Sequence, residues 1–265
     1  MGNVIIDTTN TIPATSDNDS LYFTRGGVNV DTGLDLSALL TGLVAVHVSR
    51  EWTGNIGTTS TSLKSDVDSG ASPIFRYNAG GGACWFTPGG GSTTATLIRN
   101  VGRGTLTLNG TGTVTTLESG AGQTVIGGNI TATTIRVAGG VVDLQGTSGT
   151  APTTVEVTGG SYKTARGTAG GGSITIWGGA VIVEALTNTI VTLTMAGGSL
   201  FLTQSGTITT MNLVAGNAAN VRVARPITIT TLNIWGSVEN ASSFTDNPLL
   251  TITTTNWRID TGRNF

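Results

Sequence analysis

The chain has 265 residues, of which 40 are glycine, 6 are proline and 11% are charged, while 38% are hydrophobic. This composition excludes a mainly helical protein, because glycine and threonine are poor helix formers, whereas threonine, valine and isoleucine favour strands. The net charge of −2, without a basic cluster or a long apolar run, argues against a nucleic-acid partner and a membrane span.

The N-terminal third has no regular repeat. Residues 1–20 are polar and contain Pro13, so we expect an extended N-terminal arm. Residues 21–95 contain strand-like runs, such as 43–48 and 74–77, without a constant spacing. We interpret residues 21–95 as an irregular β cap or as the first irregular coils of the solenoid that follows.

Glycines mark a regular repeat from about residue 96 to residue 236. Successive markers are 18 to 20 residues apart, at Gly104, Gly122, Gly140, Gly160, Gly179, Gly198, Gly216 and Gly236. Apolar residues lie five and three positions before most of them, as in Ile174/Ile176, with a polar residue between, which is the pattern of a half-buried strand. A second strand follows most turns, as in Val181/Val183.

This repeat predicts an all-β fold, a parallel β-helix (β-solenoid) of about 18–20 residues per coil over residues 96–236. Each coil supplies two strands, and we expect a third, less regular one, such as 230–234. Residues 237–265 leave the period, and we expect them to form a C-terminal cap or, alternatively, a subunit contact.

The chemistry-bearing residues favour a structural role over catalysis. Glu118 and Glu156 occupy equivalent positions two coils apart, and this separation is near the upper limit for the two catalytic carboxylates of an inverting glycosidase. Arg136 lies between them, however, and predicts a ladder of alternating charge. His47 has no partner motif, and Cys84, which as the sole cysteine can form no intrachain disulfide, is expected to be buried. We therefore expect no enzyme activity, no catalytic residue, no metal and no cofactor.

Trp177 and Trp235 occupy the same place in their coils, just before the turn glycine. This repetition is equally compatible with a subunit seam and with the lining of a core corner.

The chain resembles virion proteins of tailed bacteriophages, most of all β-helical head-decoration (cement) proteins. The resemblance rests on the polar arm, the run at residues 19–23 and the Gly-Gly turns, as at 139–140 and 178–179. It implies a homotrimer docked on the major capsid protein at the virion surface and assembled in the host cytoplasm, with residues 21–95 as the capsid-docking region. The implied capsid-binding residues are Ile5, Ile12, Leu21, Tyr22 and Phe23, and the implied subunit-interface residues are Trp177, Trp235 and Trp257.

Two alternatives stay open from the sequence. Tail spikes and fibres are the next resemblance, and they imply binding, or less favourably cleavage, of host surface polysaccharide. A bacterial adhesin passenger is the third, and the lack of a signal peptide disfavours it.

Overall fold

The structure is a computed structural model of the whole chain. It describes residues 3–6, 20–25, 29–30, 45–60, 62–65, 74–88, 94–127, 129–146, 149–166, 168, 172–184, 189–214, 217, 220–236 and 244–258. The chain divides into two compact units, Met1–Thr150 and Ala151–Phe265. The division falls within the residues 96–236 for which the sequence predicted one uninterrupted run.

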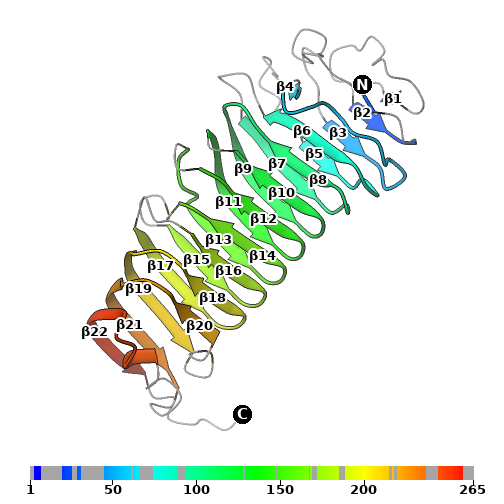
Figure 1. Cartoon of the computed structure of the whole chain (residues 1–265). Helices are drawn as coiled ribbons and strands as arrows, with labels where there is room; N and C mark the ends of the chain where they lie inside the picture. Colours follow the sequence, from blue (N-terminus) through cyan, green and yellow to red (C-terminus); the bar gives the residue numbers. More distant parts are fainter. Residues whose placement is uncertain are drawn as a thin grey trace. The chain divides into compact units, whose positions relative to one another are not determined.

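Each unit is a parallel β-solenoid, so the predicted all-β fold is confirmed (Figure 1). Helical geometry among the described residues is confined to isolated short turns. Between residues 45 and 235, strands on one side of a coil alternate in sequence with strands on the other side, and each pairs with its counterpart one coil away. This arrangement follows from the repeat, because a coil can bury its apolar rows only against neighbouring coils.

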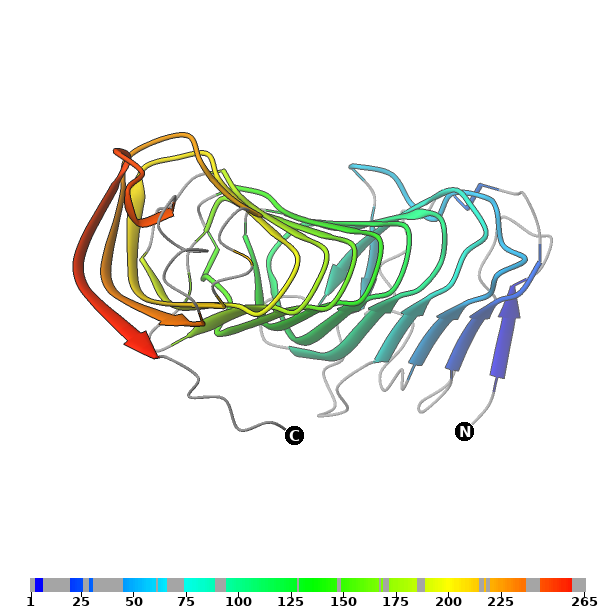
Figure 2. The ribbon, with the colours of Figure 1, turned by 90° about the horizontal axis from the view of Figure 1, so that it is seen from below.

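The first unit has two parallel sheets, which we call its front sheet and its back sheet. Figure 2 shows the front strands side by side, from blue to green. The front sheet contains, in spatial order, β1 (Asn3–Ile6), β2 (Ser20–Phe23), β3 (Ala45–Val48), β5 (Ile74–Tyr77), β7 (Thr94–Asn100), β9 (Gly112–Ser119) and β11 (Ile130–Val137). The back sheet contains β4 (Leu63–Ser65), β6 (Ala83–Pro88), β8 (Thr105–Leu108), β10 (Gln123–Ile126) and β12 (Val141–Leu144).

The second unit repeats this plan, and its last three front strands have nine residues each. Its front sheet contains β13 (Thr154–Val157), β15 (Ser173–Ile176), β17 (Ile190–Met195), β19 (Gly206–Val214), β21 (Ile227–Trp235) and β22 (Leu250–Arg258). Its back sheet contains β14 (Ser161–Thr164), β16 (Ala180–Val183), β18 (Ser199–Leu202) and β20 (Val221–Val223).

The cores are the apolar rows that the sequence predicted. In the second unit, Ile174 and Leu193 are register partners on the front sheet, as are Val181 and Leu200 on the back sheet, and all four are fully buried. Complete burial of one such side chain stabilises a fold by about 1.5–3 kcal/mol. Stacking like residues on like therefore gives every added coil its own share of core.

Aromatic residues close the core at the start of the first unit. Phe23 meets the fully buried Trp52 edge to face, with ring centroids 5.2 Å apart, and Phe75 stacks on Phe86 at 4.4 Å. The Trp52 indole donates a hydrogen bond to the carbonyl of Gly54 at 2.9 Å, which satisfies its one polar group.

Several turns that lead from a front strand to a back strand, such as that between β15 and β16, are tight and need glycine, whereas the connection from Val214 of β19 to Val221 of β20 is longer. In the second unit, Gly179 has φ +72°, and a Cβ there would lie 2.5 Å from the carbonyl oxygen of Gly160 in the preceding coil. The returns from back strand to front strand vary instead: Leu202 and Ile208 are six positions apart, whereas their register partners Val183 and Ile190 are seven positions apart. The spread of 18 to 20 residues thus arises largely in the returns.

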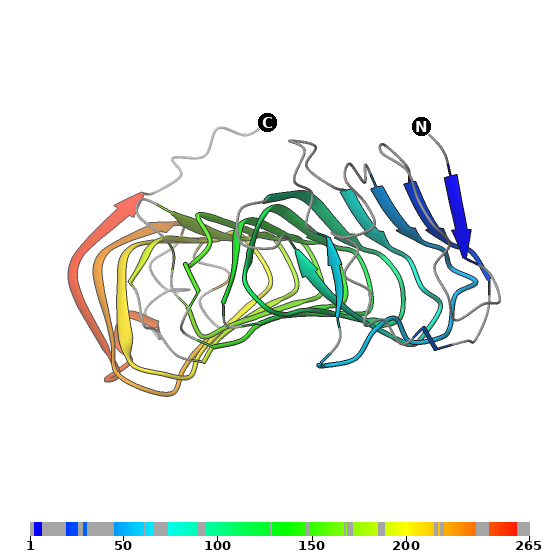
Figure 3. The same ribbon diagram turned by 90° about the horizontal axis from the view of Figure 1, so that it is seen from above.

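The predicted third strand exists in a different form. Residues 230–234 belong to β21 itself, whose register with β22 is interrupted at Thr230 and resumes at Thr231. Two register segments therefore belong to one continuous strand, and in Figure 3 the orange and red strands of this unit are nested arcs. The sequence separated these segments because the apolar alternation changes phase at the interruption.

The two ends also differ from the expectation. Asn3–Ile6 forms an edge strand in register with β2, while residues 7–19 of the predicted arm lie outside the described residues. Strands β2, β3 and β5 lie in the same front sheet as β7, so residues 21–95 supply irregular first coils. Within residues 237–265, Phe244 is buried and Leu250–Arg258 adds one more front strand.

Candidate binding surface on the first unit

One row of outward-facing side chains crosses the front sheet of the first unit. Its members are in register on successive strands and alternate with buried neighbours, as Tyr22 does with Leu21 and Phe23. We call it the outward row, and it consists of Ile5, Tyr22, His47, Arg76, Arg99, Glu118 and Arg136. Parallel pairing therefore gathers aromatic and cationic residues that are far apart in the sequence.

Tyr22 and His47 form an aromatic pair within the outward row. Their rings stack with centroids 4.8 Å apart and an angle of 15° between their planes. Burial, and then the positive charge of Arg76, lower the pKa of His47 below its ordinary value of 6.5. His47 is therefore a neutral hydrogen-bonding group at pH 7.

Glu118 is held between two arginines. Its Oε2 atom lies 2.6 Å from Arg99 and its Oε1 atom 3.5 Å from Arg136, which confirms the Glu118–Arg136 part of the predicted ladder. Both pairs are partly exposed, so each contributes at most about 1 kcal/mol. Glu156 lies in β13 of the second unit. A carboxylate neutralised on both sides is poorly suited to act as a general acid or base.

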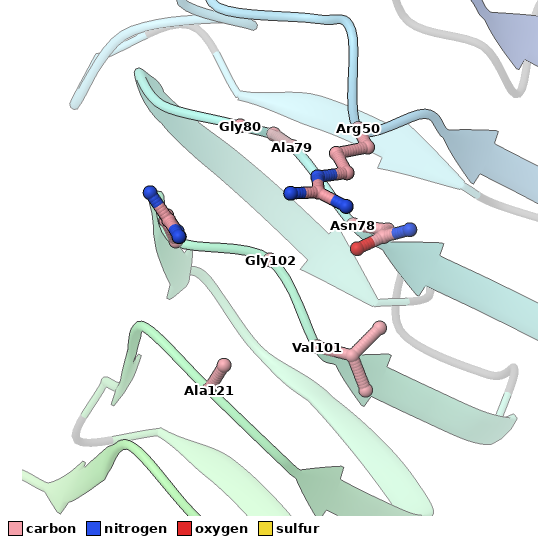
Figure 4. Close-up of a pocket in the computed structure, with 8 residues that line it drawn as sticks. Arg50, Asn78, Ala79, Gly80, Val101, Gly102 and Ala121 are labelled. Carbon is pink, nitrogen blue, oxygen red and sulfur yellow. The ribbon is translucent and has the colours of Figure 1, made fainter.

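Arg50 and Arg103 flank a hollow of about 350 Å³ beside the outward row. They belong to the turns that follow β3 and β7, and Gly80 and Gly102 lie between them in the lining. Figure 4 shows Arg50 reaching from its own turn toward the turns that carry Asn78 and Gly102. A second hollow of about 470 Å³ is lined by Tyr22, His47, Arg76 and Arg99 and shares Asn78 and Val101 with the first.

Of the five predicted capsid-binding residues, two present surface. Ile5 is 59% exposed and Tyr22 is half-buried, whereas Leu21 and Phe23 are fully buried in the core and cannot contact a partner through their side chains. The apolar alternation of residues 20–23 puts them inside, which corrects their assignment to a docking surface. Ile12 lies outside the described residues.

The three predicted subunit-interface tryptophans are all in the second unit. Trp177 is 58% exposed and Trp235 is 37% exposed, so they do not line a core corner, and the seam alternative stays a prediction. Trp257 is half-buried, in register with Ile234, and Arg258 lies 5.7 Å from the Trp235 ring centroid. Here the strand alternation ends at the turn, so the sequence could not say which way Trp177 points.

Sequence reasoning missed Arg99, Arg50 and Arg103. Arg99 precedes Glu118 by almost the same interval that separates Glu118 from Arg136, so extending the repeat one coil toward the N-terminus finds it. Arg50 carries no comparable signal, because the coils before β7 have unequal lengths. The basic residues are scattered along the sequence and gather only when the strands pair.

The remaining candidates carry no site chemistry. Cys84 is fully buried, as predicted, and burial raises the pKa of its thiol. No group of three or more His, Cys, Asp or Glu side chains in the described ranges could hold a metal ion. The described residues also contain no helix of the length and apolarity needed to cross a membrane.

Comparison with protein-family models, curated proteins and solved structures finds no match.

Proposed function

We propose that this chain is a structural virion protein that decorates and stabilises a phage capsid as a homotrimer, docked on the major capsid protein through its first unit. The supporting observation is the contrast between the outward-facing rows of the two units. The first unit presents aromatic and cationic side chains around two hollows. The second presents, in register on its front sheet, one charged residue, Glu156, followed by neutral Thr175, Thr194, Asn212, Asn233 and Asn256.

Much of that second row is satisfied internally. The Asn256 amide donates to Asn233 at 3.0 Å, Asn233 donates to Asn212 at 2.9 Å, and Asn212 donates to Thr194 at 3.1 Å. A neutral ladder that pairs with itself suits a rigid spacer, whereas a donor-rich surface suits a docking contact. This division supports docking through the first unit, with the second unit carrying the trimer contacts.

Co-sedimentation with undecorated capsids of the encoding phage tests the proposal. We expect saturable binding, with a copy number that scales with the number of capsid subunits. Ile5→Asp with Tyr22→Ala should reduce occupancy without unfolding the chain, because both side chains lie on the outside. Absence from capsids, together with a few copies on each tail, would instead indicate a spike or fibre.

The trimer is tested by sedimentation equilibrium. We expect three times the chain mass of 26.8 kDa. Trp177→Ala with Trp235→Ala should shift the distribution toward monomer, because large exposed aromatic rings are preferred anchors of protein interfaces. A wild-type monomer at micromolar concentration contradicts the trimer.

The tail-spike alternative has one observation in its favour, the exposed Trp177 ring, which offers a flat face to a sugar. It predicts binding of host surface polysaccharide that Trp177→Ala abolishes. If the spike also cleaved the polysaccharide, Glu118→Gln would stop cleavage. We expect no cleavage, because Arg99 and Arg136 neutralise this carboxylate.

A further inference from the structure

The two hollows of the first unit form a groove whose charge is largely uncompensated. We call it the arginine groove and define it by Arg50, Arg76, Arg99 and Arg103 around Asn78 and Val101. Glu118 neutralises Arg99. Arg50, Arg76 and Arg103 are exposed and form no ion pair with any residue in the part of the chain that the structure describes. The groove therefore presents three guanidinium groups to a ligand.

Two positions in the lining between Arg50 and Arg103, Gly80 and Gly102, require glycine. A Cβ on Gly102 would lie 2.5 Å from the backbone nitrogen and oxygen of Ala79, and one on Gly80 would overlap the carbonyl oxygen of Arg50. No larger side chain fits at either glycine without moving a neighbouring turn. These two positions thus carry no side chain that could neutralise or cover the arginines.

We propose that the arginine groove binds the carboxylates of an acidic peptide segment on the partner protein. Guanidinium groups match carboxylates with paired hydrogen bonds. Arg50 and Arg103 follow strands that are two positions apart in the sheet, a separation of about 9.6 Å, which an extended peptide spans in about three residues. Two acidic side chains on one short segment can therefore reach both arginines.

A peptide suits the groove better than an acidic polysaccharide does. Sugar rings bind on the faces of aromatic side chains, but Tyr22 and His47 at the rim stack on each other at 4.8 Å, so one face of each ring is covered by the other ring. The phenol hydroxyl and the imidazole also offer hydrogen bonds. The rim thus adds polar contacts and has less ring face to offer to a sugar.

Fluorescence anisotropy of a labelled decaglutamate peptide with the purified full chain tests the groove. We expect saturable binding that weakens with salt. The affinity should fall about tenfold in Arg50→Gln/Arg103→Gln, because two exposed charge pairs are lost. Arg222→Gln/Arg225→Gln is the matched control, because it removes the same charge from exposed positions of the second unit and should leave affinity within about twofold.

The replacement Arg50→Lys/Arg103→Lys keeps the charge but removes the planar guanidinium groups that form paired hydrogen bonds, so we expect an intermediate loss of affinity. Circular dichroism and thermal unfolding check that each variant folds. Failure of the wild type to bind, or equal binding by the Gln variant, overturns the proposal. Polygalacturonate that binds more tightly than decaglutamate assigns the groove to acidic polysaccharide and overturns the choice of a peptide.

The identity of the partner as a capsid protein rests on the proposed function, whereas recognition of acidic peptide does not. The two are separated by repeating capsid co-sedimentation with the same variants. A wild type that binds decaglutamate but not capsids refutes decoration and leaves the groove standing. Full capsid occupancy by Arg50→Gln/Arg103→Gln shows that another surface docks and refutes the groove as the docking contact.

Discussion

Adjacent glycines in one turn of the first unit should respond very differently to the same substitution. Gly82 has φ +73°, and a Cβ there would overlap the carbonyl oxygen of Gly54 and lie 2.8 Å from that of Thr53. Gly81 has open space at its Cβ position, with no heavy atom within 4 Å. Gly82→Ala and Gly81→Ala therefore form a matched pair, equal in side-chain volume and one residue apart.

The expected loss in Gly82→Ala has two parts. The left-handed conformation costs about 1–2 kcal/mol with a Cβ present. Displacing the Gly54 carbonyl weakens the hydrogen bond from the buried Trp52 indole, which contributes about 0.5–1.5 kcal/mol. The free energy of unfolding should therefore fall by about 2–3 kcal/mol, a decrease in Tm of roughly 5–10 °C for a chain of this size.

Gly81→Ala should change the free energy of unfolding by less than about 1 kcal/mol, in either direction. Urea unfolding followed by tryptophan fluorescence is the appropriate assay, because Trp52 is fully buried beside the affected turn. Since stacked coils need not unfold in one step, the midpoints of the same transition should be compared. Equal losses in the two variants would refute the assignment of Gly82 as a conformationally required glycine.

Three further predictions concern separate parts of the fold. The His47 ring should titrate with a midpoint below 6.5 by NMR, and Arg76→Gln should raise this midpoint. Because the unfolded chain binds the proton more readily than the folded chain, the contribution of His47 to stability is lost as the pH falls below about 6.5. An unshifted midpoint in the wild type would contradict this prediction. Asn233→Ala breaks two side-chain hydrogen bonds and should lower the free energy of unfolding by about 1–2 kcal/mol in chemical denaturation, about twice the effect of Asn256→Ala, which breaks one. Cys84 should react with a thiol reagent such as DTNB only as fast as the chain opens, because burial raises its pKa; rapid labelling of the native chain would show an accessible thiol.

The regular coils could be predicted from the sequence because local chemistry dictates them. A turn such as that at Gly140 needs positive φ, and alternation fixes which side of each strand is buried. Tyr162 and Thr164 fitted the apolar pattern poorly, yet both are buried, and the coil accommodates the Thr164 hydroxyl through hydrogen bonds to the backbone of Arg166.

The candidate surface could not be predicted, because it depends on register between coils of unequal length. Tyr22 pairs with His47 and His47 with Arg76, at intervals much longer than that between Glu118 and Arg136. A constant repeat cannot align these residues. Only hydrogen-bonded pairing of the strands settles which outward side chains are neighbours, so the clustering of arginines on this surface emerges from tertiary structure.

The contrast between fixed turns and variable returns determines where the coil tolerates foreign sequence. A side chain at Gly179, in the turn after β15, would collide with the backbone of Gly160 in the preceding coil. The return from Val183 to Ile190 already differs in length from the corresponding return from Leu202 to Ile208, while the flanking strands keep their register. Peptide epitopes grafted into such returns should be displayed without changing the core, whereas a graft that replaces Gly179 should destabilise the coil.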